Sequence, residues 1–118
     1  MKIEKKIIKK NLSFADIEFE IQPVGEDIFI LIRGGDKPHI GSCVLSIPRP
    51  SLADDEKISC TSSVLNVVGH KDENICRLVA ESFCKKFNTT VICTGGFHVD
   101  NLTAEKIAEV VNACNFDF

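Results

Sequence analysis

The three histidines of this chain all occur in glycine-containing segments, and each has an aspartate within three positions. The segments are Gly34-Gly35-Asp36-Lys37-Pro38-His39, Gly69-His70-Lys71-Asp72 and Gly95-Gly96-Phe97-His98-Val99-Asp100. Glycine lets backbone N–H groups approach a ligand closely, and imidazole is a common metal ligand. The pattern therefore suits two kinds of site, one for an anion and one for a metal ion.

An anion site would combine backbone N–H groups of these segments with nearby cations. A helix expected to begin near Asp72 adds unpaired N–H donors at its N-terminus. The candidate ligand- or phosphate-binding residues are Gly34, Gly35, Asp36, Lys37, His39, Arg49, His70, Lys71, Gly96 and His98. The same residue types also form ordinary turns and helix caps, so a purely structural interpretation stands beside this one.

In the alternative site, His39, His70 and His98 bind a divalent metal while the aspartates orient the imidazoles. The histidines lie in three separate segments, so no local spacing motif supports this site. Nucleophilic catalysis has no support either, because the sequence contains no GxSxG elbow and no cysteine-protease signature. We assign no catalytic residue and expect ligand binding rather than catalysis.

Length and composition predict a single domain over residues 1–118, with 44% hydrophobic and 26% charged residues and a net charge of −3. A lysine-rich start, Lys2 to Lys10, precedes an acidic remainder, which argues against nucleic-acid binding. No apolar run is long enough for a signal peptide or a membrane span. The six cysteines form no CxxC pair and are expected to be reduced. These features predict a cytoplasmic protein that does not bind membranes.

The first half of the chain has the pattern of antiparallel strands. Residues 16–21 alternate strictly between apolar and acidic side chains, and a turn at 24–27 leads into an apolar strand at 28–32. Residues 40–47 are expected to form the third strand of this meander, ended by Pro48 and Pro50. A further strand begins near Ile58 and extends toward Val68, with a bend or bulge at 61–63. The basic start is expected to be an edge strand.

The second half changes to helical spacing. A helix is expected from Asp72, its N-cap, to Asn88, with Ile75, Val79 and Phe83 among its buried residues. After a short strand at 89–94, Thr103 caps a second helix, whose expected buried stripe is Ile107, Val110, Val111 and Cys114. The element order predicts a two-layer α+β domain, a mostly antiparallel sheet of about six strands with two helices.

Four motifs in succession resemble one protein family. They are Gly34-Gly35-Asp36-Lys37-Pro38-His39-Ile40-Gly41, Pro48-Arg49-Pro50-Ser51-Leu52, Gly69-His70-Lys71-Asp72-Glu73 and Gly96-Phe97-His98-Val99-Asp100-Asn101. They are similar to the small accessory subunit of gallate decarboxylase and its relatives, the prenylated-flavin chaperone-like proteins. The similarity extends from about Gly34 to Val111. It implies a fold like that of the proteasome assembly chaperones, commonly as a dimer.

The resemblance also implies a function. It suggests an accessory protein that binds reduced prenylated FMN and assists maturation of a UbiD-type decarboxylase. The phosphate of such a ligand would suit Lys37, Arg49 or Lys71, and the histidines would suit its polar edges or an accompanying metal ion. These segments are then expected to form one pocket. The alternatives are a metal-dependent small-molecule enzyme that uses the three histidines, and a purely structural assembly chaperone.

Overall fold

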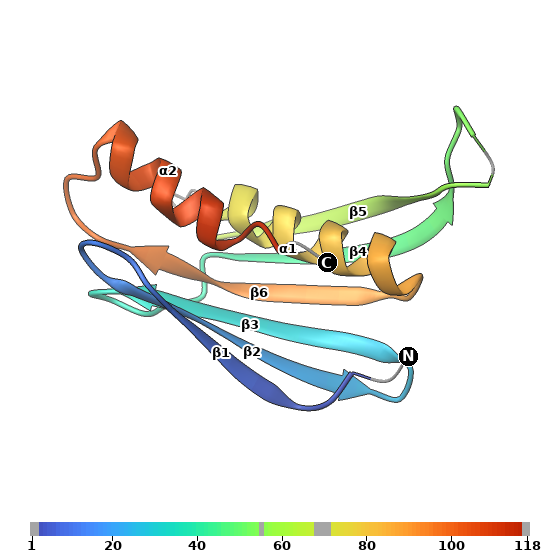
Figure 1. The fold of residues 1–118 in the computed structure, drawn as a ribbon, viewed down its shortest axis with the longest axis horizontal. Helices are drawn as coiled ribbons and strands as arrows, with labels where there is room; N and C mark the ends of the chain where they lie inside the picture. Colours follow the sequence, from blue (N-terminus) through green and yellow to red (C-terminus); the bar gives the residue numbers. More distant parts are fainter. Residues whose placement is uncertain (1–2, 55, 68–71, 117–118) are drawn as a thin grey trace.

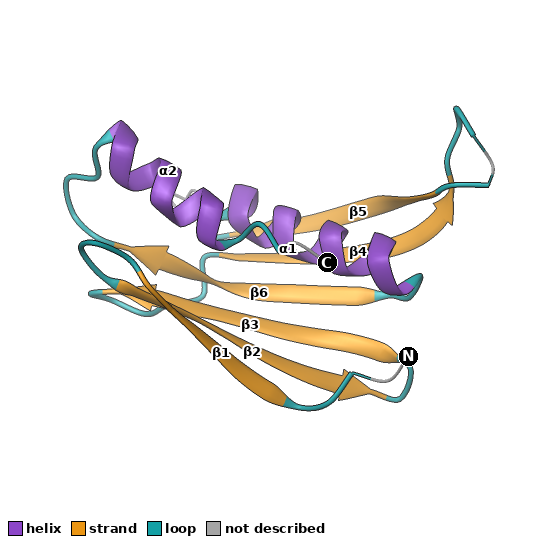
Figure 2. Cartoon of the chain, in the orientation of Figure 1, coloured by secondary structure: helices purple, strands orange, loops and turns teal. Residues whose placement is uncertain are grey.

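The computed structural model describes residues 3–54, 56–67 and 72–116, which form a six-stranded sheet and two helices. In chain order the elements are β1 (Lys6–Asn11), β2 (Asp16–Val24), β3 (Asp27–Gly35), β4 (Ser42–Pro50), β5 (Ile58–Asn66), α1 (Glu73–Phe87), β6 (Val91–His98) and α2 (Ala104–Ala113). Both helices cover the same face of the sheet (Figure 1; Figure 2). The expected two-layer α+β fold is confirmed.

The core lies between this face and the helices. The alternation in β2 buries Ile17, Phe19 and Ile21 completely, while Glu18 on the opposite face forms an ion pair with Arg33 of β3, with 2.6 Å between Oε2 and Nε. Burying a side chain such as Phe19 stabilises a fold by about 2–3 kcal/mol. The alternation thus decides which face of the sheet receives the helices.

The strand order corrects one expectation. The strands lie in the order β1-β2-β3-β6-β4-β5, so β6 separates β3 from β4 and the meander ends at β3. β6 pairs in parallel with β3 and antiparallel with β4. Consecutive strands often pair with their neighbours in sequence as a meander. The apolar β6 is more completely buried in the middle of the sheet, and it therefore lies between β3 and β4. This insertion brings the carboxyl ends of β3 and β6 to the same edge.

The ladder between β4 and β5 corrects two more expectations. It runs without interruption from Ser42 opposite Asn66 to Pro50 opposite Ile58, so the strand does not end at the prolines and no bulge occurs at 61–63. The N–H of Ser51 donates to the carbonyl of Lys57 at 2.8 Å. Because N–H directions alternate along a strand, the nitrogens of Pro48 and Pro50 face away from β5.

The ends of the chain's elements agree with the sequence signals. β1 is an edge strand, as its lysines predicted. Helix α1 ends at Asn88, which adopts the left-handed conformation with φ 50° and ψ 52°. Neither of the helices in the described part of the chain is long and apolar enough to cross a membrane.

Candidate functional site

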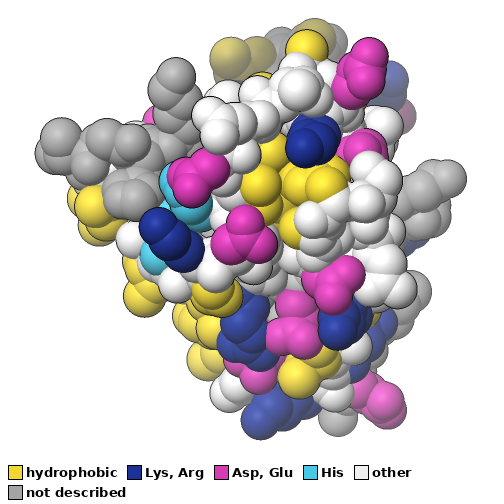
Figure 3. Space-filling model, turned by 90° about the vertical axis from the view of Figure 1, so that its left-hand side faces the viewer, with side chains coloured by type: hydrophobic (Ala, Val, Ile, Leu, Met, Phe, Trp, Pro, Cys, Tyr) yellow, Lys and Arg dark blue, Asp and Glu magenta, His cyan; other side chains and the backbone are white. Residues whose placement is uncertain are grey.

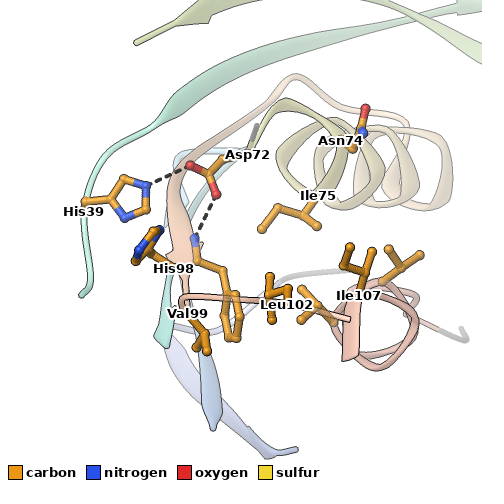
Figure 4. A pocket seen from close by; sticks show the side chains of 11 residues that line it. His39, Asp72, Asn74, Ile75, His98, Val99, Leu102 and Ile107 are labelled. Carbon is orange, nitrogen blue, oxygen red and sulfur yellow. Dashed lines mark hydrogen bonds and ion pairs between the residues drawn. The ribbon is translucent and has the colours of Figure 1, made fainter. Parts of the chain in front are cut away.

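A pocket of about 420 Å³ lies where the start of α1, the end of β6 and helix α2 meet. Figure 3 looks onto this end of the molecule and shows hydrophobic side chains gathered together, with the histidines to one side. The pocket is lined by His39, Asp72, Asn74, Ile75, Phe97, His98, Val99, Leu102, Ile107, Val110 and Val111. His39, Asp72 and His98 lie together at one end of the pocket, Asn74 lies apart from them on α1, and the rest of the wall is hydrocarbon (Figure 4).

The polar end is built around Asp72, whose carboxylate contacts both His39 and the backbone of Phe97 (Figure 4). Oδ1 accepts a hydrogen bond from the backbone N–H of Phe97 at 2.9 Å, and Oδ2 lies 2.8 Å from Nε2 of His39. The Asp72 side chain is only 7% exposed, against 20% for His39. A buried carboxylate needs such partners to offset the loss of hydration. The His39–Asp72 pair therefore ties the loop after β3 to the start of α1 and to β6.

Both ring nitrogens of His39 are engaged. Nδ1 lies 2.9 Å from the carbonyl oxygen of Lys37, which can only accept, so this nitrogen carries a proton. A second proton on Nε2 makes the contact with Asp72 a charge-assisted hydrogen bond. Partial burial of the ring lowers the pKa of His39, but the hydrogen bonds to Lys37 and Asp72 outweigh this effect and raise the pKa above its usual 6.5. The arrangement favours the imidazolium form.

A raised pKa makes the contribution of His39 to stability depend on pH. The contribution is complete below the ordinary value of about 6.5 and is lost as the pH rises through the raised folded-state value. We expect an NMR titration of the imidazole Cε1 proton to give a pKa above 6.5 in the native protein. The Asp72→Asn variant should have a lower His39 pKa, while Asp100→Asn should leave it unchanged. An unshifted midpoint in the native protein would contradict the imidazolium assignment.

Two glycines make room for the His39–Asp72 pair. A Cβ atom on Gly41 would overlap Asp72 Oδ2, and one on Gly96 would lie 2.8 Å from both Asp72 Oδ2 and His39 Nε2. At the adjacent end of β3, Gly35 has a φ of +79°, and a Cβ there would overlap the carbonyl oxygen of His98. Gly41 and Gly96 thus permit close packing around the two side chains, and Gly35 permits the close approach of β3 to the backbone of His98.

His98 lines the pocket beside His39. The two ring centroids are 6.2 Å apart and the ring planes are nearly perpendicular. Nε2 of His98 lies 2.9 Å from Oδ1 of Asp100, an exposed carboxylate two residues further along the chain. Two histidines, each in contact with its own aspartate, therefore stand together at the polar end of the pocket.

The comparisons with known proteins agree with this architecture. The sequence matches the family described as "prenylated flavin chaperone LpdD-like domain" over residues 12–116. The chain belongs to this family. The resemblance seen in the loop motifs is thereby confirmed.

A solved structure has a similar fold. It is entitled "Crystal Structure of a Novel Chaperone Complex for Yeast 20S Proteasome Assembly", with a TM-score of 0.51 and 11% sequence identity. The alignment covers 92% of this chain and 91% of the other. At this identity the likeness concerns the fold alone. A comparison with curated protein sequences gives no significant match.

In this prenylated-flavin chaperone-like domain, the predicted loops converge only in part. His39 and His98 line the pocket, Gly96 lies against the His39–Asp72 pair, and the N–H of Asp36 donates to the carbonyl of His98 at 2.8 Å. Gly34 lies under the Phe97 ring, where a Cβ would be 2.7 Å from Cδ2. Lys37 is exposed and is not among the residues that line the pocket, and its carbonyl oxygen lies 2.9 Å from Nδ1 of His39. Gly69, His70 and Lys71 lie outside the described residues.

Arg49 does not join this group within one chain. It lies near the far end of β4, seven residues beyond Ser42, where Nε donates to Oγ1 of Thr61 at 2.9 Å and Nη1 to the carbonyl of Pro50 at 3.0 Å. Seven strand residues span about 23 Å. The expectation that Arg49 shares a pocket with the histidines is wrong for the single chain, because β4 leads away from them.

Sequence reasoning assigned different roles to two features of the site. Asp72 is the N-cap residue of α1, as expected, but its side chain makes no cap hydrogen bond and contacts His39 and Phe97 instead. In α2, Ile107 and Val111 were expected to be buried, yet they are 48% and 41% exposed. They line the outer wall of the pocket. Their apolar side chains therefore face the pocket and are not part of the buried core.

The metal alternative lacks a cluster of ligands in the described ranges. Within residues 3–54, 56–67 and 72–116, no group of three His, Cys, Asp or Glu side chains is placed to hold a metal ion. His39 and His98 lie close together, but His70, the third proposed ligand, is outside the described residues. The metal site therefore stays a prediction.

Proposed function

We propose that this protein binds reduced prenylated FMN in the pocket between α1, β6 and α2 and helps to mature a UbiD-type decarboxylase. The observation that carries the proposal is a pocket with two histidines at one end and hydrocarbon elsewhere, in a chain of the prenylated-flavin chaperone family. A chaperone must hold its ligand without consuming it. Binding and release, rather than catalysis, are the functions we assign to this site.

The residues present fit such a ligand. A volume of about 420 Å³ falls within the range of small-molecule sites. A flavin has a polar pyrimidine edge and an apolar benzenoid edge, and the prenyl group adds hydrocarbon. His98 would hydrogen-bond to the polar edge and the fixed ring of His39 would pack beside it. Ile75, Leu102 and Ile107 would contact the apolar part, and exposed Lys37 would bind the phosphate. The flavin supplies the chemistry of decarboxylation only in the partner enzyme.

The engagement of His39 also favours a binding role over acid–base catalysis. A general base needs a nitrogen that can reach the substrate proton and a pKa near the working pH. In His39, one nitrogen faces the carbonyl of Lys37 and the other faces Asp72. Both nitrogens are therefore occupied within the protein, and the ring of His39 is held in a fixed orientation at the wall of the pocket.

Anaerobic titration with reduced prenylated FMN, followed by flavin absorbance, tests the proposal. We expect saturable binding by the native protein and at least a tenfold weaker Kd for His39→Ala, which corresponds to about 1.4 kcal/mol. Lys37→Ala should weaken binding through the loss of a phosphate contact, whereas Lys57→Ala, at the distant turn after β4, should not. Equal affinity of the native, His39→Ala and Lys37→Ala proteins would reject the proposed site.

We also propose that the protein is a homodimer and that its partner is the decarboxylase itself. The family supports a partner enzyme, because a flavin chaperone must deliver its ligand to a protein that uses it. The flavin content and the yield of the decarboxylase that co-purifies with native or Ile107→Glu protein would separate this function from that of a structural assembly chaperone. A flavin chaperone should transfer less cofactor when the pocket is altered, whereas a structural chaperone should assemble its partner equally well.

A further inference from the structure

The two edges of the sheet differ in how they are protected. At one edge, β1 has the sequence KIIKKN, with lysines of the kind that discourage pairing with another strand. At the other edge, β5 has the sequence ISCTSSVLN, nine residues without a charge or a proline. Such a strand is open to pairing with a further strand.

The hydrogen bonds of β5 show which backbone groups are available. The N–H of Val67 donates to the carbonyl of Gly41 at 2.9 Å, and the ladder between β4 and β5 continues in this register. Because bonding directions alternate along an antiparallel strand, the odd-numbered residues of β5 bond to β4. The even-numbered residues from Ile58 to Asn66 direct their N–H and C=O groups outward. No other strand of the described residues pairs with this edge.

A row of alternating charges on α1 lies beside the same strand. Nδ2 of Asn66 donates to Glu73 at 2.9 Å, and the hydroxyl of Ser62 donates to Glu81 at 2.6 Å. Arg77 lies between the two glutamates and forms ion pairs with both. One turn further, Lys85 is close enough to act electrostatically on Cys60 of β5. Along α1 the charges are therefore negative, positive, negative and positive.

This order is self-complementary about a two-fold axis. Residues 73–81 of α1 rise about 12 Å along the helix axis, and residues 62–66 of β5 span about 13 Å. Two turns of the helix therefore match four residues of the strand in length. The centre of the charge row lies at Val79, level with Ser63. Rotation by 180° there places Arg77 opposite the partner's Glu81, and Glu73 opposite the partner's Lys85.

We propose that β5 pairs antiparallel with β5 of a second copy about a two-fold axis at Ser63, forming a continuous twelve-stranded sheet. Ser62 and the partner's Val64 then form a hydrogen-bonded pair, and Ser63 faces the partner's Ser63 in a non-hydrogen-bonded pair. Backbone bonds provide the attraction, and the charges of the two α1 helices select the register. The interface deepens the homodimer proposed above and shares no residue with the pocket lining.

Ser63 is exposed and lies at the centre of this interface, which makes it the position to test. In a non-hydrogen-bonded pair the two Cα atoms are about 4.5 Å apart, so Ser63→Lys sets two ammonium groups face to face. We expect S63K and S63E to be monomeric by analytical ultracentrifugation where the native protein is a dimer. An equimolar mixture of the two variants should restore the dimer.

Ile47 provides the matched control, because it lies 49% exposed on the sheet face that the helices leave uncovered. Ile47→Lys should remain dimeric if the strand edges pair, and it should become monomeric if two sheets pack face to face. A monomeric native protein, or dimeric S63K and S63E beside a monomeric I47K, would overturn the proposal. Circular dichroism confirms that each variant is folded. Flavin titration of the S63K monomer shows separately whether the pocket functions.

Discussion

Replacing Asp72 by alanine is expected to lower the free energy of unfolding by about 3 kcal/mol. The change leaves the N–H of Phe97 without its acceptor in a buried position and removes the carboxylate that faces the His39 imidazolium. For a domain of this size the unfolding midpoint should fall by on the order of 10 °C. Thermal and urea unfolding at pH 6, where the imidazolium is favoured, measure the loss.

Two further variants isolate the cause. Asp36→Ala removes an exposed aspartate near the same pocket and should change stability by no more than about 0.5 kcal/mol. Asp72→Asn keeps an oxygen that can accept from Phe97, so it should be less destabilising than Asp72→Ala. Its deficit should shrink as the pH rises and His39 becomes neutral. If Asp72→Ala were as stable as Asp36→Ala, the carboxylate would not be the link between α1, β6 and the loop after β3.

Replacing Ile107 by glutamate should weaken the binding of reduced prenylated FMN by at least tenfold with little effect on folding. Ile107 is 48% exposed and lines the apolar wall of the pocket. A carboxylate there must lose hydration when the ligand's hydrocarbon covers it, and it also repels the ligand phosphate. The Kd from anaerobic titration, with the unfolding midpoint of the same preparation, separates binding from stability.

Ala108→Glu is the matched control for this variant. It places the same charge on the same helix, at an exposed position that does not line the pocket. Native-like affinity in Ala108→Glu together with weakened affinity in Ile107→Glu would assign the effect to the pocket wall. Equal losses in both variants would instead point to the net charge of α2, and native affinity in Ile107→Glu would place the flavin elsewhere.

Several features of the fold could be predicted because their signals are local. The alternation at 16–21 identified β2 and its buried face, and the apolar spacing from Ile75 to Phe83 identified α1. The prolines misled the prediction for β4 because their effect depends on which edge their nitrogens face. Which edge the proline nitrogens face depends on the register between β4 and β5, and whether that edge is paired depends on where β6 ends. Neither can be predicted from the neighbouring residues.

The candidate site shows the same division. The glycine-flanked segments around His39 and His98 were correctly expected to come together, but Asp72 looked like a simple helix cap. Its partners, His39 and Phe97, are 33 and 25 positions away in the sequence. Likewise, Ile107 and Val111 have the spacing of a buried helix stripe. Periodicity identifies an apolar face but not whether the core or a pocket lies against it.

The amino-acid order was enough to predict the period of most elements, the main turns and the family, because these depend on neighbouring residues and on the succession of motifs. The position of β6 between β3 and β4 follows only from the three-dimensional fold. This insertion brings the ends of β3 and β6 and the start of α1 together, so that His39, Asp72 and His98 share one pocket. The glycine-histidine loops could be recognised in the sequence, but their common site results from long-range strand pairing.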